Sequence, residues 1–436
     1  MGDMEQTADK ELENKVSFRS FPRVYFELVF VGFVIIMGMG LSSSFLPIFA
    51  EELDPSGILV GLVVSSWFLS RIFIELPGGI ISDRIGRRKL LLLGIGLSAV
   101  GPAICSQSRS IYTLILGRAI WGLGTSFYFM NNTALIIDLF PPKIRGRALG
   151  TFQGVEFIGS FVGAPIGAFL AEFFLSRGMG YTSVFYFTLL LVLGSLVLAL
   201  SSKNLRKVDV GMSHGKGPPI REIFSSLGNW GIAAICIMSL CRMLLMQGIF
   251  QTVFQLYLKN DLLYDEIFIG IVISFRTAGH IVAVILAGWL SDRIGRKPVL
   301  MAGYLIGALS LAAYPFARGL EAFFLVGFLA GFGEGFEFTT LIVLLSDIAP
   351  PRMRGGAIGL FRTFMSVGGV AGPIVFASIY DQMGAASAFY TAVAINVLNA
   401  VLLATIRAEK PAAPQKEGAN AAALTDESTP KKSADS

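Results

Sequence analysis

The stretch Ser82-Asp83-Arg84-Ile85-Gly86-Arg87 reads SDRIGR, and the chain repeats it without change at 291–296. The same shift of 209 positions aligns the segment 138–146 (DLFPPKIRG) with the segment 347–355 (DIAPPRMRG). An even number of long apolar runs separates the two copies. This spacing predicts two halves with the same topology, related by an axis along the membrane normal.

The composition is typical of a membrane protein. Of the 436 residues, 54% are hydrophobic and 15% are charged, and the mean hydropathy is +0.68. The small net charge of +5 lies on loops, so nucleic acid is not an expected partner. The three cysteines, Cys105, Cys236 and Cys241, fall in apolar runs without other metal-binding residues beside them. We therefore expect buried thiols and neither a metal nor another cofactor.

Apolar runs long enough to cross a bilayer recur along the chain. A helix needs about 20 apolar residues to cross the hydrocarbon core. Twelve runs qualify, at 24–49, 58–81, 89–108, 111–137, 148–173, 181–201, 229–257, 266–290, 298–317, 321–345, 356–380 and 386–407. The sequence thus predicts an all-α membrane protein with twelve transmembrane helices in two parallel six-helix bundles.

The longest linker divides the twelve runs into six and six. The expected parts are an N-terminal segment (1–23), a six-helix half (24–201), a linker (202–228), a second six-helix half (229–407) and a disordered tail (408–436). The termini and the even-numbered linkers hold 26 of the 35 basic residues, and the opposite linkers hold four. The positive-inside rule therefore predicts that both termini and the 202–228 linker are cytoplasmic, in a multi-pass protein of the cytoplasmic membrane.

The loop around each hexapeptide resembles the signature loop of the major facilitator superfamily, Gly-x-x-x-Asp-Arg-x-Gly-Arg-Arg. The first copy runs from Gly79 through Asp83 to Lys89, and the second runs from Gly288 through Asp292 to Lys297. The resemblance implies the major facilitator fold over residues 24–407. It also implies a conformational latch between the halves at these loops, with the stronger latch at Asp83. A role for the basic residues as topology anchors alone is the alternative.

The latch candidates comprise the two loops and the charged residues at the end of the fourth run. They are Gly79, Asp83, Arg84, Gly86, Arg87, Arg88, Asp138, Arg145, Gly288, Asp292, Arg293, Gly295 and Arg296.

An ionisable residue inside a predicted helix costs about 2.5–3.5 kcal/mol to insert, and ten such residues are candidates for function. They are Arg71, Glu75, Arg118, Glu156, Arg242, Arg276, His280, Glu334, Glu337 and Arg362. Arg71 and Glu75 are four residues apart, so a local ion pair between them is one interpretation. Arg276 and His280 have the same spacing and share a helix face.

Glu334 and Glu337 lie three residues apart on one face of the tenth run. Two carboxylates on one face repel each other, which favours binding of a proton. An ion pair with Arg242 or Arg276 is the alternative. The candidates for proton coupling are Glu334, Glu337, Glu156, Arg118 and Glu75. Arg118 belongs to the stretch Arg118-Ala-Ile-Trp-Gly122-Leu-Gly124, which is similar to the family's motif on the fourth helix, whose Arg the resemblance links to coupling.

Amides and aromatic residues interleave on the fourth and seventh runs and suit a cavity for amphipathic ligands. Amides also hold helices together, so a structural role is the alternative. The substrate-binding candidates are Arg71, Arg242, Arg276, Gln247, Gln251, Asn131, Asn132 and Tyr128.

The fifth run has the pattern Gly150-x8-Gly159-x3-Gly163-Ala-Pro165, which resembles the antiporter motif of drug efflux members. Ala164 separates Gly163 from Pro165, and the motif's final Gly pair is absent. Helix packing by these glycines is the alternative.

No nucleotide-driven pump or enzyme is expected, because Gly211-Met-Ser-His-Gly215-Lys216-Gly217 lacks the spacing of a phosphate-binding loop. The resemblance to the drug:proton antiporter branch implies a monomeric secondary transporter in membrane lipid that exchanges amphipathic compounds for protons. Transport of an organic anion is the alternative, because five intramembrane arginines outnumber four glutamates. A sensor without transport activity is the third hypothesis.

Overall fold

The computed structural model describes residues 21–75, 86–140, 142–207, 226–350 and 354–406. All regular secondary structure within these residues is helical, as the sequence predicts. Nine of the described helices are long and apolar enough to cross a membrane, one of them being the segment Gly356–Thr405 that holds the last two predicted runs. The prediction of an all-α membrane protein is therefore confirmed.

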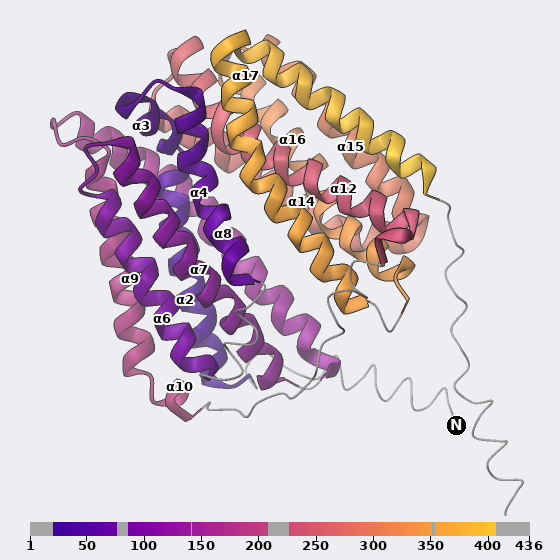
Figure 1. Ribbon diagram of the computed structural model, residues 1–436, viewed down its shortest axis with the longest axis horizontal. Helices are drawn as coiled ribbons and strands as arrows, with labels where there is room; N and C mark the ends of the chain where they lie inside the picture. Colours follow the sequence, from indigo (N-terminus) through magenta and orange to yellow (C-terminus); the bar gives the residue numbers. More distant parts are fainter. Residues whose placement is uncertain (1–20, 76–85, 141, 208–225, 351–353, 407–436) are drawn as a thin grey trace, which may run out of the picture.

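The helices form two groups, which are the indigo-to-magenta and pink-to-yellow parts of Figure 1. The N-terminal group consists of α2 (Arg23–Ser43), α3 (Leu46–Leu53), α4 (Gly57–Glu75), α6 (Arg87–Cys105), α7 (Ile111–Leu139), α8 (Pro142–Leu175), α9 (Thr182–Ser201) and α10 (Lys203–Lys207). The C-terminal group consists of η2 (Ser226–Gly228), α12 (Trp230–Leu245), η3 (Met246–Val253), α13 (Phe254–Leu256), η4 (Tyr257–Asp261), α14 (Glu266–Ile294), α15 (Arg296–Ala313), η5 (Tyr314–Phe316), α16 (Gly319–Ile348) and α17 (Arg354–Thr405).

Four predicted helices differ in detail from the structure. The run 24–49 is two helices, because Pro47 in the first turn of α3 has no N–H for continuing α2. The run 229–257 includes a π-helical stretch, η3, and a second one, η4, begins at its last residue, Tyr257. The last two runs form one element, α17, which changes direction at Gly384, where φ is 79°. Only glycine adopts this φ readily.

The repeat is visible as equivalent contacts in both groups. Arg87 pairs with Asp138, and Arg296 pairs with Asp347 at 3.4 Å. These two ion pairs are related by the sequence offset of 209. They join the start of α6 to the end of α7, and the start of α15 to the end of α16. The starts of α6 and α15 therefore make equivalent contacts, as the repeat predicts.

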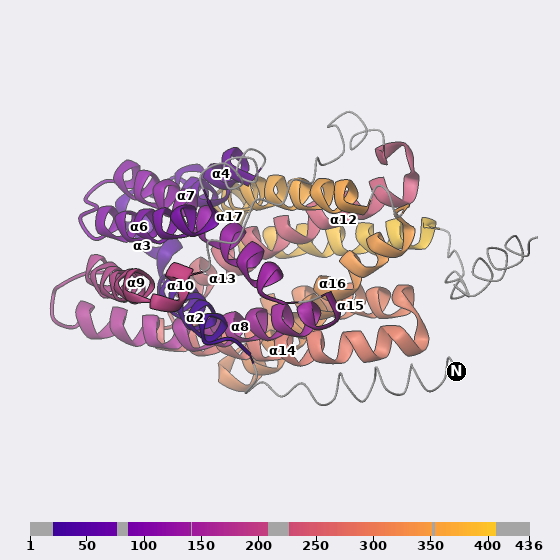
Figure 2. The ribbon, with the colours of Figure 1, turned by 90° about the horizontal axis from the view of Figure 1, so that it is seen from below.

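The two groups pack together at one end of the helices. One hydrophobic cluster contains residues of both groups, among them Leu41, Phe68, Ile249 and Phe376. At the other end the core divides into a cluster from the N-terminal group and another from the C-terminal group. We call the shared end, which includes α3, the closed end, and the opposite one, which includes α10, the divided end. Figure 1 shows α3 and α10 at opposite ends, and Figure 2 shows the groups side by side.

Polar contacts reinforce the closed end. The Ser65 hydroxyl donates to the Val370 carbonyl at 2.6 Å, which ties α4 to α17. Tyr181 OH donates to Glu266 Oε1 at 2.6 Å, and Lys259 Nζ donates to the same oxygen at 2.7 Å. Glu266 is only 1% exposed. Tyr181 belongs to the N-terminal group and Glu266 to the C-terminal group, so this buried contact links the two groups.

Candidate coupling site in the C-terminal group

A buried ion cluster lies at the centre of the C-terminal group, around Glu334 of α16. Arg276 of α14 donates to Glu334 Oε2, and Arg242 Nη2 of α12 lies 3.6 Å from Glu334 Oε1. His280 Nδ1 lies 3.8 Å from the same oxygen. All four residues are at most 6% exposed. The sequence left open whether Glu334 and Glu337 pair with Arg242 or Arg276. For Glu334, the structure shows these ion pairs.

Glycines bring the two helices of this cluster close together. A Cβ on Gly331 of α16 would lie 1.8 Å from the Arg276 carbonyl oxygen, and one on Gly279 of α14 would lie 2.1 Å from the Phe328 carbonyl oxygen. No larger residue fits such a backbone contact. The close approach brings Arg276 within reach of Glu334. Arg276 and His280 are one turn apart and both face this acid, as the spacing predicts.

Aromatic rings surround the charged groups. The Arg276 guanidinium lies 4.9 Å from the centre of the Phe250 ring, and the Arg242 guanidinium lies 4.9 Å from that of Phe338. The His280 ring lies 5.1 Å from Phe157, a residue of α8 in the other group. Cation–π contacts of this kind stabilise a desolvated cation. The cluster therefore reaches the boundary between the groups through His280.

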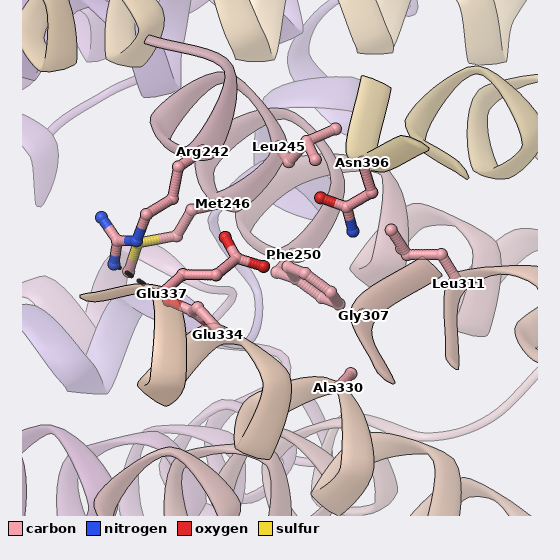
Figure 3. Close-up of a pocket in the computed structure, with 10 residues that line it drawn as sticks. All are labelled: Arg242, Leu245, Met246, Phe250, Gly307, Leu311, Ala330, Glu334, Glu337 and Asn396. Carbon is pink, nitrogen blue, oxygen red and sulfur yellow. Dashed lines mark ion pairs between the residues drawn. The ribbon is translucent and has the colours of Figure 1, made fainter. Parts of the chain in front are cut away.

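Glu337 differs sharply from Glu334, although it lies only one turn further along α16. It is 4% exposed, and within the described residues it makes no ion pair or hydrogen bond. Its side chain lines a small cavity in the C-terminal group (Figure 3). The cavity is lined by Arg242, Leu245, Met246, Phe250, Gly307, Leu311, Ala330, Glu334, Glu337 and Asn396. The structure thus separates a paired acid from an unpaired one.

Candidates of the N-terminal group lie apart from this cluster. Arg118 is 7% exposed, and its guanidinium lies 5.3 Å from the Trp121 ring centre. Glu156 Oε1 is buried without a hydrogen-bond partner among the described residues. Arg71 lies 4.5 Å from the Trp67 ring centre. The side chain of Glu75 falls outside the described part of the chain.

The expectation of five buried arginines is wrong for two of them. Arg362 is exposed, and Arg71 is half-buried because its guanidinium lies over the Trp67 ring at the surface of α4 and not within the core. Arg118, Arg242 and Arg276 are buried.

The amide candidates are packed inside their own groups in this conformation. Tyr128, Asn131 and Asn132 are 0% exposed, and Asn132 Nδ2 donates to Tyr128 OH at 2.5 Å. Gln247 is 8% exposed, and Gln251 is half-buried. Their role in substrate binding stays a prediction.

The chain was compared with known proteins. The family profile described as Major Facilitator Superfamily matches residues 28–251 and 235–433. The chain belongs to the major facilitator superfamily. It is thus a multi-pass membrane transporter of small molecules, not an enzyme, as the sequence predicts.

Two curated relatives illustrate the similarity. The chain is 24% identical over 382 residues to the quinolone resistance protein NorA of Staphylococcus aureus (strain MSSA476), covering 87% of this chain and 95% of NorA. It is 26% identical over 378 residues to the multidrug resistance protein MdtG of Klebsiella pneumoniae (strain 342), covering 85% and 89%. The resemblance to the drug efflux branch is therefore confirmed as a similarity.

Two solved structures share the fold. A bacterial homologue of the human lysosomal transporter Spinster, in an inward-facing and unoccupied conformation, has a TM-score of 0.70 at 16% identity, covering 87% of this chain and 95% of that one. The human organic anion transporter MFSD10 has a TM-score of 0.60 at 18% identity, covering 86% and 98%. These likenesses confirm the major facilitator fold.

The signature loops of the superfamily are partly described. Gly79, Asp83 and Arg84 lie outside the described residues. Gly86 and Gly295 turn the chain into α6 and α15 with φ of 99° and 93°.

The described charged residues among the latch candidates make contacts within their own group. Arg145 Nε donates to the Phe140 carbonyl at 2.8 Å, and the Arg293 guanidinium lies 4.2 Å from the Trp289 ring centre. Asp292 pairs with Arg296 at 2.5 Å. Arg88 is half-buried, and a Cβ on Gly288 would meet nothing within 4 Å. The latch between the groups stays a prediction for all the residues of these loops.

The sequence reasoning missed buried polar residues near Glu337. Tyr304 of α15 and Asn396 and Asn399 of α17 are at most 3% exposed, with polar atoms that have no hydrogen-bond partner within the described chain. Amides inside the apolar run 386–407 are the signal that could have revealed two of them.

Proposed function

We propose that this transporter exports amphipathic compounds in exchange for protons, with Glu337 as the proton carrier. The observation that carries this proposal is the buried Glu337 carboxylate, which has no ion pair within the described residues and lies beside a cluster of fixed charges. The similarity to proteins named for quinolone and multidrug resistance supports the export of such compounds.

Charge balance explains how a proton at Glu337 matters to the cluster. Arg242 and Arg276 carry two positive charges, and Glu334 carries one negative charge. Ionised Glu337 balances the remaining positive charge, and protonated Glu337 leaves it uncompensated. An uncompensated charge is costly in a low-dielectric interior and favours contact with water or with an opposite charge. Protonation therefore biases the C-terminal group between two conformations, which is what coupling requires.

The positive-inside rule gives the orientation of the proposed cycle. It places both termini, the 202–228 linker and thus the divided end in the cytoplasm. The structure then represents the state with its outer end closed. The two proposed halves, 24–201 and 229–407, rock about the central site, and the loop of Asp83 latches them together when the cytoplasmic end closes.

Reconstitution tests the function directly. Purified protein in liposomes is given a pH gradient together with a panel of lipophilic cations and organic anions. We expect proton movement that depends on the cations, and at least a tenfold loss of gradient-driven transport in Glu337→Gln. Glu321→Gln is the matched control, because Glu321 is exposed at the start of the same helix. Unchanged gradient-driven transport in Glu337→Gln overturns the proposal.

Transport of an organic anion is the second candidate function. Arg118 favours it, because this buried guanidinium makes no ion pair within the described residues. A substrate carboxylate or phosphate would supply the missing charge. Flux of anions but not of cations in the same liposomes supports this alternative, and no flux of either class supports a sensor without transport activity.

A further inference from the structure

The buried polar groups opposite Glu337 have no role in the proposed transport cycle as described so far. Asn396 projects from α17 and is 3% exposed. Among the described residues, neither its Oδ1 nor its Nδ2 has a hydrogen-bond partner. A buried amide without partners is costly in a membrane helix, so it indicates a ligand or a specific function. Asn396 and Glu337 both line the same cavity.

Gly307 of α15 brings Asn396 and Glu337 within reach of the same space. A Cβ on Gly307 would lie 2.8 Å from Asn396 Nδ2 and 3.6 Å from Glu337 Oε1. The two polar atoms therefore flank one point and are close enough for a single water molecule to bridge them. Figure 3 shows both side chains directed toward the interior of the cavity, with Gly307 beside them.

The size of the cavity fits water and excludes a drug-sized molecule. The centre of a water molecule can occupy about 20 Å³ of it. About 10–15 Å³ of such space is enough for one water, provided that two or more polar groups line it. A carboxylate and an amide supply these partners.

We propose that the space beside Gly307 is a water-binding site and that Asn396 is a positioning residue for Glu337. The Asn396 amide donates to the water, and the water donates to the Glu337 carboxylate. This arrangement stabilises the ionised form of Glu337 and so lowers the pH range in which Glu337 takes up a proton. The inference rests on the proposed function only in assigning that proton to transport.

Three further titratable or charged groups face Glu337, and a test of the water site must leave them unchanged. They are Arg242 from α12, Glu334 from the same helix and Tyr304 from α15. The positive charge of Arg242 attracts the ionised Glu337 carboxylate, and the negative charge of Glu334 repels it.

Gly307→Ala and Asn396→Leu test the water site without touching the charged residues. In Gly307→Ala, the added methyl group displaces the water. It lies 2.8 Å from the movable end of Asn396 and makes an ordinary contact with Glu337 Oε1 at 3.6 Å, so we expect the protein to fold. Gly96→Ala in the equivalent helix α6 is the control, because its Cβ meets nothing within 4 Å. Folding is checked by the thermal unfolding temperature of each purified variant.

The readout is direct and does not require transport. Dicyclohexylcarbodiimide modifies protonated carboxyl groups in apolar surroundings, and mass spectrometry measures the adduct on Glu337 as a function of pH. We expect the midpoint of labelling to rise by about 0.5 pH unit or more in both test variants, a change of about threefold in proton affinity. The control should match the parent protein.

A midpoint within about 0.2 pH unit of the parent in either folded variant overturns the water site. This outcome is distinct from failure of the proposed function. If liposomes show no proton-driven flux but the midpoint rises, the water site stands and the coupling role of Glu337 falls. If the flux is proton-driven and the midpoint does not move, the coupling role stands and Asn396 has no part in it.

Discussion

At the scale of single residues, two glutamates one turn apart have different environments. Glu334 is held by Arg276 and Arg242, whereas Glu337 faces a small cavity. Their spacing in the sequence predicts the shared helix face, and this much could be read from the sequence. It does not predict which acid meets the arginines, because that depends on the packing of α12, α14 and α16 in three dimensions. In the proposed transport cycle, Glu334 therefore organises the cluster and Glu337 exchanges the proton.

Removing the charge of Glu334 should destabilise the protein. In Glu334→Gln, two buried guanidinium groups lose their carboxylate, and leaving a buried charge unpaired costs about 3–5 kcal/mol. We expect the unfolding temperature in detergent to fall well below that of Glu337→Gln, which removes no ion pair of a described residue. The double variant Glu334→Gln with Arg276→Gln should recover part of the loss. Equal stability of the two single variants contradicts the division of roles.

At the scale of helices, glycines determine which helices approach closely. On α8, a Cβ on Gly163 would lie 2.6 Å from the Met37 carbonyl oxygen of α2, and on α17 a Cβ on Gly372 would lie 2.4 Å from the Leu244 carbonyl oxygen of α12. The antiporter-like glycine pattern thus packs equivalent helix pairs in both groups. The sequence predicted these helices and their repeat because both are local patterns. It did not predict the π-helical stretch η3 of the seventh run, where Thr252 Oγ1 donates to the Gln247 carbonyl at 2.8 Å.

Two glycines of α14 provide a matched test of close packing. Gly279→Ala places a methyl group against the backbone of α16, and overpacking of this kind costs about 1–3 kcal/mol. Gly288→Ala lies on the same helix, where a Cβ meets nothing within 4 Å. We expect a lower unfolding temperature for Gly279→Ala only, because only that methyl group meets the backbone of a neighbouring helix. A similar fall in both variants would show that helix propensity, and not packing, is the cause.

At the scale of the whole molecule, the contact between Tyr181 and Glu266 closes one end of the transporter. Burial and the hydrogen bond to Glu266 hold the pKa of Tyr181 above its usual value, so the phenol keeps its proton and donates. Lys259 compensates the charge of the buried carboxylate at 2.7 Å. Sequence patterns did not predict this contact, because its partners are 85 positions apart and belong to different groups. Tyr181 and Glu266 come close together only because the two groups of helices pack against each other at this end.

Replacing Tyr181 by Phe should shift the molecule away from the closed-end state. The variant removes one hydrogen bond between the buried Glu266 carboxylate and the N-terminal group, and loss of a hydrogen bond to a charged group costs about 1.5–3 kcal/mol. That cost changes the ratio of the two states by roughly tenfold or more. Tyr186→Phe is the matched control, because Tyr186 is 50% exposed on α9.

Spin labels on the two groups can measure this shift. Met179 and Leu263 are exposed at the closed end, one in each group, and the native cysteines are buried, so introduced cysteines at 179 and 263 should label selectively. In the Tyr181→Phe protein, pulsed electron resonance should show a larger fraction of long label distances than in the parent protein or in Tyr186→Phe. Identical distance distributions in all three proteins would mean that this hydrogen bond does not hold the outer end shut. In that case, the apolar cluster shared by the two groups would supply the closure by itself.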